Sequence, residues 1–290
     1  MFVKVPISAA LLTPLRNAYY LSFPVVLGAV LSNRMAARLS DVVPVHWATP
    51  IVLALVVWMI YTIDRLLDVQ KVTPASSSSR LTPRHAFHRQ HATDLWRGVL
   101  AAALLALILC FFLPGSVIRF GLALGAVCAG YVFMVFRLPN RHSALLLKEP
   151  LVAVLFSAGV WGSVWVQRPT VSGVEITQAL MFTVIAFQNL ILFSVMEQWE
   201  RPEQPQFSLA TAWGLERSIT LLGWLTLGVV STGLTLCFIT SDRFAQRASL
   251  MLAIMSLVLY VIQRFPAYFL RNERYRWLGD GVFWLPALVL

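Results

Sequence analysis

The sequence predicts an all-α, polytopic membrane protein of about nine transmembrane helices, built as two four-helix halves plus a C-terminal helix. Of its 290 residues 58% are hydrophobic and only 12% are charged, and the mean hydropathy is +0.73. The apolar residues form long blocks, and a helix needs about 20 such residues to cross a bilayer. Acidic pairs also close the second and sixth blocks, which suggests two related halves. This composition excludes an ordinary soluble globular domain.

The blocks predict the spans in order. Pro24 is expected to kink the first span, Pro114-Gly115 to turn the chain between the third and fourth, and Pro150 to open the fifth. We treat residues 1–290 as one transmembrane domain with two cytoplasmic polar segments, a loop or lid at 65–97 and a loop at 197–217 that carries the second acidic pair. The expected spans are 17–32, 46–63, 95–113, 117–136, 150–167, 177–196, 218–239, 247–263 and 277–290.

The basic residues indicate orientation. The net charge is +10, but the basic residues lie in the connections and form no single patch, so we expect no nucleic-acid partner. With the N-terminus in the cytoplasm, 17 of the 23 Lys and Arg fall on that side, which is the positive-inside bias. We expect a multi-pass protein of a bacterial inner membrane, whose first apolar block is retained and not cleaved as a signal peptide. Cys110, Cys128 and Cys237 lie in apolar spans and are expected to be buried thiols.

The first acidic pair is Asp64 and Asp68, at the cytoplasmic end of the second span. Residues four apart share one face of a helix, so these carboxylates need a cation or another partner. An ordinary charged helix end, paired with Arg65 or Lys71, remains an alternative.

The polar segment after this pair carries histidines. A helix is expected from about residue 83, with His85, His88 and His91 close together. A metal site is one interpretation, but the segment lacks an HExxH context, so we favour a lid that faces an anion or lipid headgroups.

The second acidic pair is Glu197 and Glu200, one turn apart at the end of the sixth span, although a charged helix end before Pro202 is an alternative. The same span carries Gln188 and Asn189 within the bilayer. Two further charged positions stand out at span ends. Lys148 precedes the fifth span, where it serves the site or extends to headgroups, and Asp280 in the last span is expected to pair with Arg276.

Both acidic pairs should emerge on one side of the membrane, because four crossings separate them. Facing carboxylates repel unless cations lie between them, and Mg²⁺ shares its ligand shell between carboxylates, phosphate oxygens and water. Such a rim suits a diphosphate leaving group, and the apolar spans beneath it suit a long isoprenoid tail. The basic residues expected on this rim are Arg65, Lys71, Arg137, Arg141 and Lys148.

These motifs resemble those of the UbiA superfamily of intramembrane prenyltransferases. Asp64 and Asp68 match the family's Asn-x-x-x-Asp-x-x-x-Asp motif, with Ile60 in place of the Asn. Glu197 and Glu200 match its second, Asp-rich motif, with Gln204 where a third acid often falls, and Lys148 matches the Lys before the fifth helix. The departures indicate a divergent member with altered metal geometry, a different acceptor or weakened catalysis.

The resemblance implies Mg²⁺-dependent transfer of an isoprenyl group from a prenyl diphosphate to a lipophilic, possibly aromatic, acceptor in the membrane. The expected metal ligands are Asp64, Asp68, Glu197 and Glu200, which with Lys148 form the catalytic set. The expected substrate-binding residues are Arg65, Lys71, Arg141, Tyr131 and Asn189. A non-catalytic UbiA-like protein that binds prenyl lipids or assists assembly is the main alternative. A transporter is the weaker one, because the acids gather at one face and not at the membrane midplane.

Overall fold

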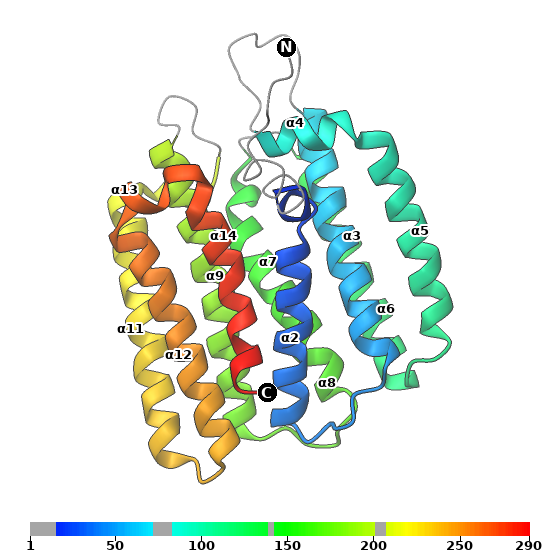
Figure 1. Cartoon of the computed structure of the whole chain (residues 1–290), viewed down its shortest axis with the longest axis vertical. Coiled ribbons are helices and arrows are strands. Elements are labelled where there is room, and N and C mark those ends of the chain that lie inside the picture. Colours follow the sequence, from blue (N-terminus) through cyan, green and yellow to red (C-terminus); the bar gives the residue numbers. More distant parts are fainter. Residues whose placement is uncertain (1–15, 72–82, 139–141, 201–206) are drawn as a thin grey trace, which may run out of the picture.

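The computed structural model describes residues 16–71, 83–138, 142–200 and 207–290, and these form a bundle of long helices (Figure 1). Residues 16–20 are helical and lead into the bundle. The elements after them are α2 (Phe23–Leu39), α3 (Ala48–Lys71), α4 (Pro83–Gln90), α5 (Ala92–Cys110), α6 (Gly115–Arg137), η1 (Ser143–Leu147), α7 (Lys148–Ser157), the π-helical turn η2 (Ala158–Gly162), α8 (Ser163–Trp165), α9 (Gly173–Glu200), α10 (Leu209–Trp213), α11 (Leu215–Ile239), α12 (Arg243–Arg264), α13 (Pro266–Phe269), η3 (Arg271–Glu273), α14 (Arg274–Gly281) and η4 (Val282–Leu288).

The nine-span prediction agrees with this arrangement. Seven helical stretches of the described chain are long and apolar enough to cross a membrane, with residues 143–165 counted as one stretch. The two remaining crossings are the 17-residue α2 and the composite of α14 and η4. The protein is therefore an all-α, multi-pass membrane protein.

Helix α9 is the centre of the bundle. It packs against α7, α11 and α12, and 61% of its most apolar window is buried, against 11% for α6 at the periphery. The core around it includes Phe182, Ile185, Ile191 and Leu192. A helix that is apolar on all sides suits this buried position, and it brings the second acidic pair to the middle of one end of the bundle.

The first crossing differs from the prediction. Ser22 has φ 61°, a left-handed conformation that ends the helix at 16–20, and α2 then starts at Phe23 with Pro24 in its first turn. Pro24 therefore opens a helix and does not kink one. The first crossing shifts from 17–32 to Phe23–Leu39, so that Arg34 and Arg38, which were expected in a loop, lie in α2.

The C-terminal crossing also differs from the continuous span expected at 277–290. Asn272 and Glu273 have positive φ values of 56° and 54°, and this turn directs α14 back into the bundle. Helix α14 contacts α2 and α9, and η4 contacts α2 and α12. The last segment therefore lies between the two halves, next to the acidic end of α9 (Figure 1).

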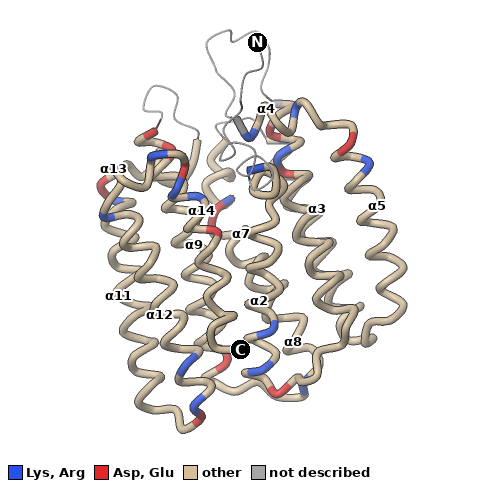
Figure 2. The backbone as a smooth tube through the Cα atoms, in the orientation of Figure 1, with Lys and Arg blue, Asp and Glu red and all other residues tan. Residues whose placement is uncertain are grey.

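Charged residues gather toward the two ends of the bundle, while its middle is mostly uncharged (Figure 2). The short helix α4 lies at the end where the acidic pairs emerge (Figure 1). The helix expected from about residue 83 is thus confirmed, and it packs on α3 and α5.

Candidate active site

The first acidic pair lies on the last two turns of α3. Lys148, at the start of α7, places its Nζ 3.6 Å from Asp64 Oδ1, and both side chains are about one-third exposed. Asp68 is half-buried, and within the described residues it has no ion pair of its own. Among the described side chains the partner of Asp64 is therefore Lys148 from another helix, and not Arg65 of its own helix.

Tyr131 of α6 lies beside this pair. It is 7% exposed, its hydroxyl has no hydrogen-bond partner within the described part of the chain, and it is within electrostatic range of Lys148, Asp64 and Asp68. The structure thus brings four of the expected site residues together.

The other predicted basic residues are less gathered. Arg65 points toward the start of α2, where its Nε donates a 3.4 Å hydrogen bond to Ser22 Oγ. Lys71 is the last residue of α3, and its side chain lies outside the described structure, as does the whole of Arg141.

The second acidic pair is engaged by α14. Arg276 Nη2 donates to Glu197 Oε1 at 2.6 Å, and the Tyr275 hydroxyl donates to Glu200 Oε2 at 3.1 Å. The expectation that Arg276 pairs with Asp280 is therefore wrong, because the guanidinium turns toward α9. Asp280 instead lies next to the Asn189 side chain.

Helix α4 adds Arg84 to this end of the bundle. Burial, together with the nearby guanidinium groups of Arg65 and Arg276, lowers the pKa of Arg84 to about 10, so it stays protonated at neutral pH. Within the described chain neither Arg65 nor Arg84 forms an ion pair. Positive charge therefore accumulates between α3, α4 and α14.

The α4 histidines face the protein. His88 is 1% exposed, and its Nδ1 is 2.9 Å from the Arg84 carbonyl oxygen. Burial lowers the pKa of both His85 and His88 to about 4. Among the described residues no group of three or more His, Cys, Asp and Glu side chains is placed to hold a metal.

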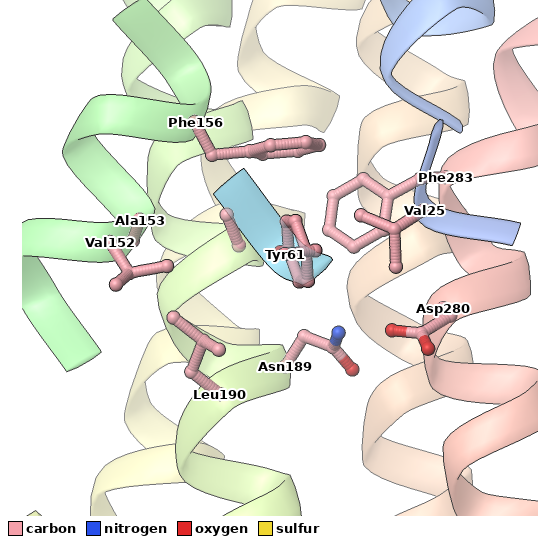
Figure 3. Close-up of a pocket in the computed structure, with 10 residues that line it drawn as sticks. Val25, Tyr61, Val152, Ala153, Phe156, Asn189, Leu190, Asp280 and Phe283 are labelled. Atoms are coloured by element: carbon pink, nitrogen blue, oxygen red, sulfur yellow. The ribbon is translucent and has the colours of Figure 1, made fainter. Parts of the chain in front are cut away.

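A small, mainly apolar cavity of about 20 Å³ lies between α9, α7 and α14 (Figure 3). Asn189 and Asp280 face each other across one side of it, and Tyr61 reaches in from α3. Its apolar lining includes Val25, Val152, Ala153, Phe156 and Phe283. Asp280 also lies within electrostatic range of Arg65, Arg84 and Arg276, so the cavity opens beneath the cationic end of the site.

The two acidic pairs differ as possible Mg²⁺ ligands. Asp64 and Asp68 are partly exposed and lie one turn apart, and among the described side chains Lys148 is the one that forms an ion pair with them, so this pair fits a magnesium ion that is completed by water and phosphate oxygens. Glu197 and Glu200 do not fit a second ion, because each is bound by a side chain of α14.

The sequence did not predict four residues of the site, which are Arg84, Tyr275, Arg276 and Asp280. Arg276 had been assigned to Asp280, and Asp280 had not been placed in a cavity. A signal existed, since a carboxylate and a guanidinium close to an apolar span are costly unless they serve a site. Their neighbours, Asn189 and Glu197, lie on α9, far away in the sequence. The residues around Arg276 and Asp280 therefore do not reveal these contacts.

Comparison with solved structures identifies the fold. The chain is similar to the apo structure of a UbiA homolog from Aeropyrum pernix K1, with a TM-score of 0.59 and 13% identity over 91% of this chain and 96% of that chain. No protein-family model matches the chain, and no curated protein matches it in sequence. The chain therefore has the UbiA-type fold, and its sequence is divergent.

Proposed function

We propose that this protein transfers an isoprenyl group from a prenyl diphosphate to a lipophilic acceptor within the membrane. The observation that carries the proposal is the position of the cavity. An apolar space containing Asn189 and Asp280 lies directly beneath a rim where Asp64, Lys148 and three arginines converge. The UbiA-type fold supports the same reaction class by analogy.

The diphosphate lies at the rim and the isoprenoid tail extends into the apolar bundle. Asp64 and Asp68 would hold Mg²⁺, which supplies positive charge against the diphosphate oxygens. Lys148 and Arg65, with Lys71 and Arg141 on the adjacent segments, neutralise the leaving group, and the Tyr131 hydroxyl donates to it. Glu197 and Glu200 complete the rim by fixing Arg276 and Tyr275.

In the reaction, the bond between the allylic carbon and the diphosphate oxygen breaks, and its electron pair leaves with the diphosphate. The same carbon forms a bond to the acceptor. The proton that the acceptor loses passes to the Asp280 carboxylate, which Asn189 orients in the cavity. Exclusion of water by the apolar lining protects the allylic cation from hydrolysis.

The test is prenyl transfer by the purified protein in detergent, with Mg²⁺, allylic diphosphates of several lengths and aromatic acceptors. Asp64→Asn with Asp68→Asn should abolish product formation. Asp94→Asn, at an exposed acid paired only with Arg97, is the control and should leave transfer unchanged. Undiminished turnover in the Asp64/Asp68 double variant would refute the proposal.

A non-catalytic prenyl-lipid-binding protein is the second candidate, favoured by the capture of Glu197 and Glu200 by α14. It predicts that prenyl lipids copurify with the chain, and that a variant with all four acids neutralised still complements a deletion strain. Loss of complementation in that variant would decide for the enzyme.

A further inference from the structure

We propose that Arg276 takes the place of a divalent ion at the second acidic pair, so that this end of the site binds the diphosphate through arginines and without a metal. The inference rests on the proposed function, because it concerns the same leaving-group site. It changes the expected chemistry of that site. One end uses carboxylates that can hold Mg²⁺, and the other uses a guanidinium already fixed by a carboxylate.

The Arg276–Glu197 pair is well buried on the arginine side. The Arg276 side chain is 7% exposed, and Nη2 lies 2.6 Å from Glu197 Oε1. A metal ion at Glu197 would have to displace this guanidinium, and leaving a buried charge without its partner is strongly unfavourable. Glu200 is exposed, but it accepts from Tyr275 on the same turn of α14 as Arg276.

Arg276 has hydrogen-bonding capacity left over. Its Nε is buried and has no hydrogen-bond partner among the residues that the structure describes. A guanidinium carries five N–H donors in a planar fork, which matches phosphate oxygens. The group is also held between rings, with Cζ 5.1 Å from the Tyr275 centroid and 6.0 Å from the Phe193 centroid. A rigid, buried cation with an unused donor calls for an anionic acceptor.

Two further arginines converge on the same place from other elements. Arg84 of α4 lies within electrostatic range of Arg65 and Arg276, and neither Arg65 nor Arg84 has an ion pair in the described structure. The acids within electrostatic range of these three arginines include Glu197, Asp280, Asp68 and Glu273. Three guanidinium groups that converge from separate elements can bind a diphosphate through bidentate, charge-assisted hydrogen bonds.

The source of the positive charge therefore differs between the two ends. At the α3 end Asp64 and Asp68 remain accessible for an ion, while at the α9 end the protein's own Arg276 performs the neutralisation. This accounts for Glu in place of Asp in the second motif, because the longer side chain reaches the guanidinium of α14.

The test measures binding of inorganic pyrophosphate to the purified full chain in uncharged detergent by calorimetry, once in excess EDTA and once in Mg²⁺. We expect wild-type binding to persist in EDTA. Arg276→Gln should weaken it about tenfold or more in EDTA, the effect of losing a charge-assisted hydrogen bond. Arg274→Gln, two residues away and stacked over Tyr268, is the matched control and should bind as wild type.

Glu197→Gln separates the two roles of this acid. If Glu197 only holds Arg276, its neutralisation leaves pyrophosphate binding equal or tighter, because a competing negative charge is gone. If Glu197 is a metal ligand, binding in Mg²⁺ weakens. Thermal unfolding of each variant in detergent establishes that it is folded.

Electron paramagnetic resonance of Mn²⁺ gives a second readout. With pyrophosphate present, the bound Mn²⁺ signal should be lost in Asp64→Asn with Asp68→Asn and retained in Glu197→Gln. Loss of Mn²⁺ on Glu197→Gln, or wild-type binding that vanishes in EDTA, overturns the inference and leaves prenyl transfer standing. Absence of pyrophosphate binding under both conditions overturns both proposals. Displacement of pyrophosphate by phosphatidylglycerol would assign the arginines to a lipid headgroup and also overturn the inference.

Discussion

Lys148 at the start of α7 lies 3.6 Å from Asp64 at the end of α3, and this contact joins the two halves of the bundle at the rim of the site. On the proposed function, it links the acidic pair that would hold the metal with a cation that would neutralise the leaving group. Because both side chains are about one-third exposed, the pair can open to admit a ligand without the cost of a fully buried bridge.

Lys148→Gln should lower kcat/KM for prenyl transfer by about 10- to 100-fold, because the leaving group loses a charge-assisted contact. In the double variant Lys148→Gln with Asp64→Asn, the fold loss of kcat/KM should be smaller than the product of the two single losses, since the residues act as a unit. Steady-state kinetics of the four variants of this cycle measure the coupling. The exposed Arg97–Asp94 pair is the matched cycle and should show none. Strict additivity at Lys148 and Asp64 would contradict a joint role.

Ala153→Phe should fill the cavity beneath the rim. Ala153 is 1% exposed and lines the cavity on α7. We expect transfer to bulky acceptors to fall at least tenfold, while pyrophosphate binding at the rim stays unchanged. Val154→Phe is the control, because Val154 is the next residue, is 51% exposed and does not line the cavity. Equal effects of the two substitutions would show that the cavity does not hold the acceptor.

Gly279→Ala should disturb Asn189. A Cβ at this position would lie 2.6 Å from Asn189 Oδ1 and 2.5 Å from Phe193 Cε1, so α14 and α9 must move apart. We expect a loss of about 1–3 kcal/mol of stability, as for other overpacked sites, with reduced transfer. Gly281→Ala has open space around it and should match wild type in thermal unfolding and turnover. If the Gly279→Ala variant has the thermal stability and turnover of the wild type, α14 is not packed against α9 as described.

Gln188→Leu should loosen the packing of α9 on α11 and α12. Gln188 Nε2 donates to Thr226 Oγ1 at 2.9 Å, and Gln188 Oε1 accepts from Ser256 Oγ at 2.7 Å. Interhelical hydrogen bonds in membranes contribute about 0.6–1.7 kcal/mol each, so we expect a loss of about 1–3 kcal/mol in thermal unfolding. Thr235→Val is the control, since this exposed hydroxyl bonds only the carbonyl of its own helix. Equal melting temperatures of the two variants would contradict this role.

The stability of the α4 region should fall with acidification. Burial lowers the pKa of His88 to about 4, whereas the ordinary value is 6.5. Between these values the unfolded chain binds the proton and the folded chain does not, so stability falls as pH drops from about 6.5 to about 4 and then levels off. The melting temperature in detergent across this range measures it. His88→Gln should remove part of this dependence, and His85→Gln together with His88→Gln should flatten the profile, because burial also lowers the pKa of His85 to about 4. An unchanged profile in the double variant would contradict this origin.

The long crossings could be predicted because hydropathy is local, and they hold from the second to the eighth. The first crossing was misplaced because one residue, Ser22, adopts a left-handed conformation that hydropathy does not encode. The site could be predicted only in part, because residue spacing is local whereas contacts between helices are not. Spacing identified the acidic pairs, but their partners Lys148 and Arg276 lie on other helices, and only the packed fold selects them.

The late position of α14 in the chain has a consequence for biosynthesis. Tyr275, Arg276 and Asp280 come from the last of the nine crossings, whereas Asp64 comes from the second. While the ribosome is still translating, the inserted part of the polypeptide carries the carboxylate end of the rim but lacks the guanidinium end and one wall of the cavity. On the proposed function, the binding site for the diphosphate is therefore incomplete until α14 has entered the bilayer.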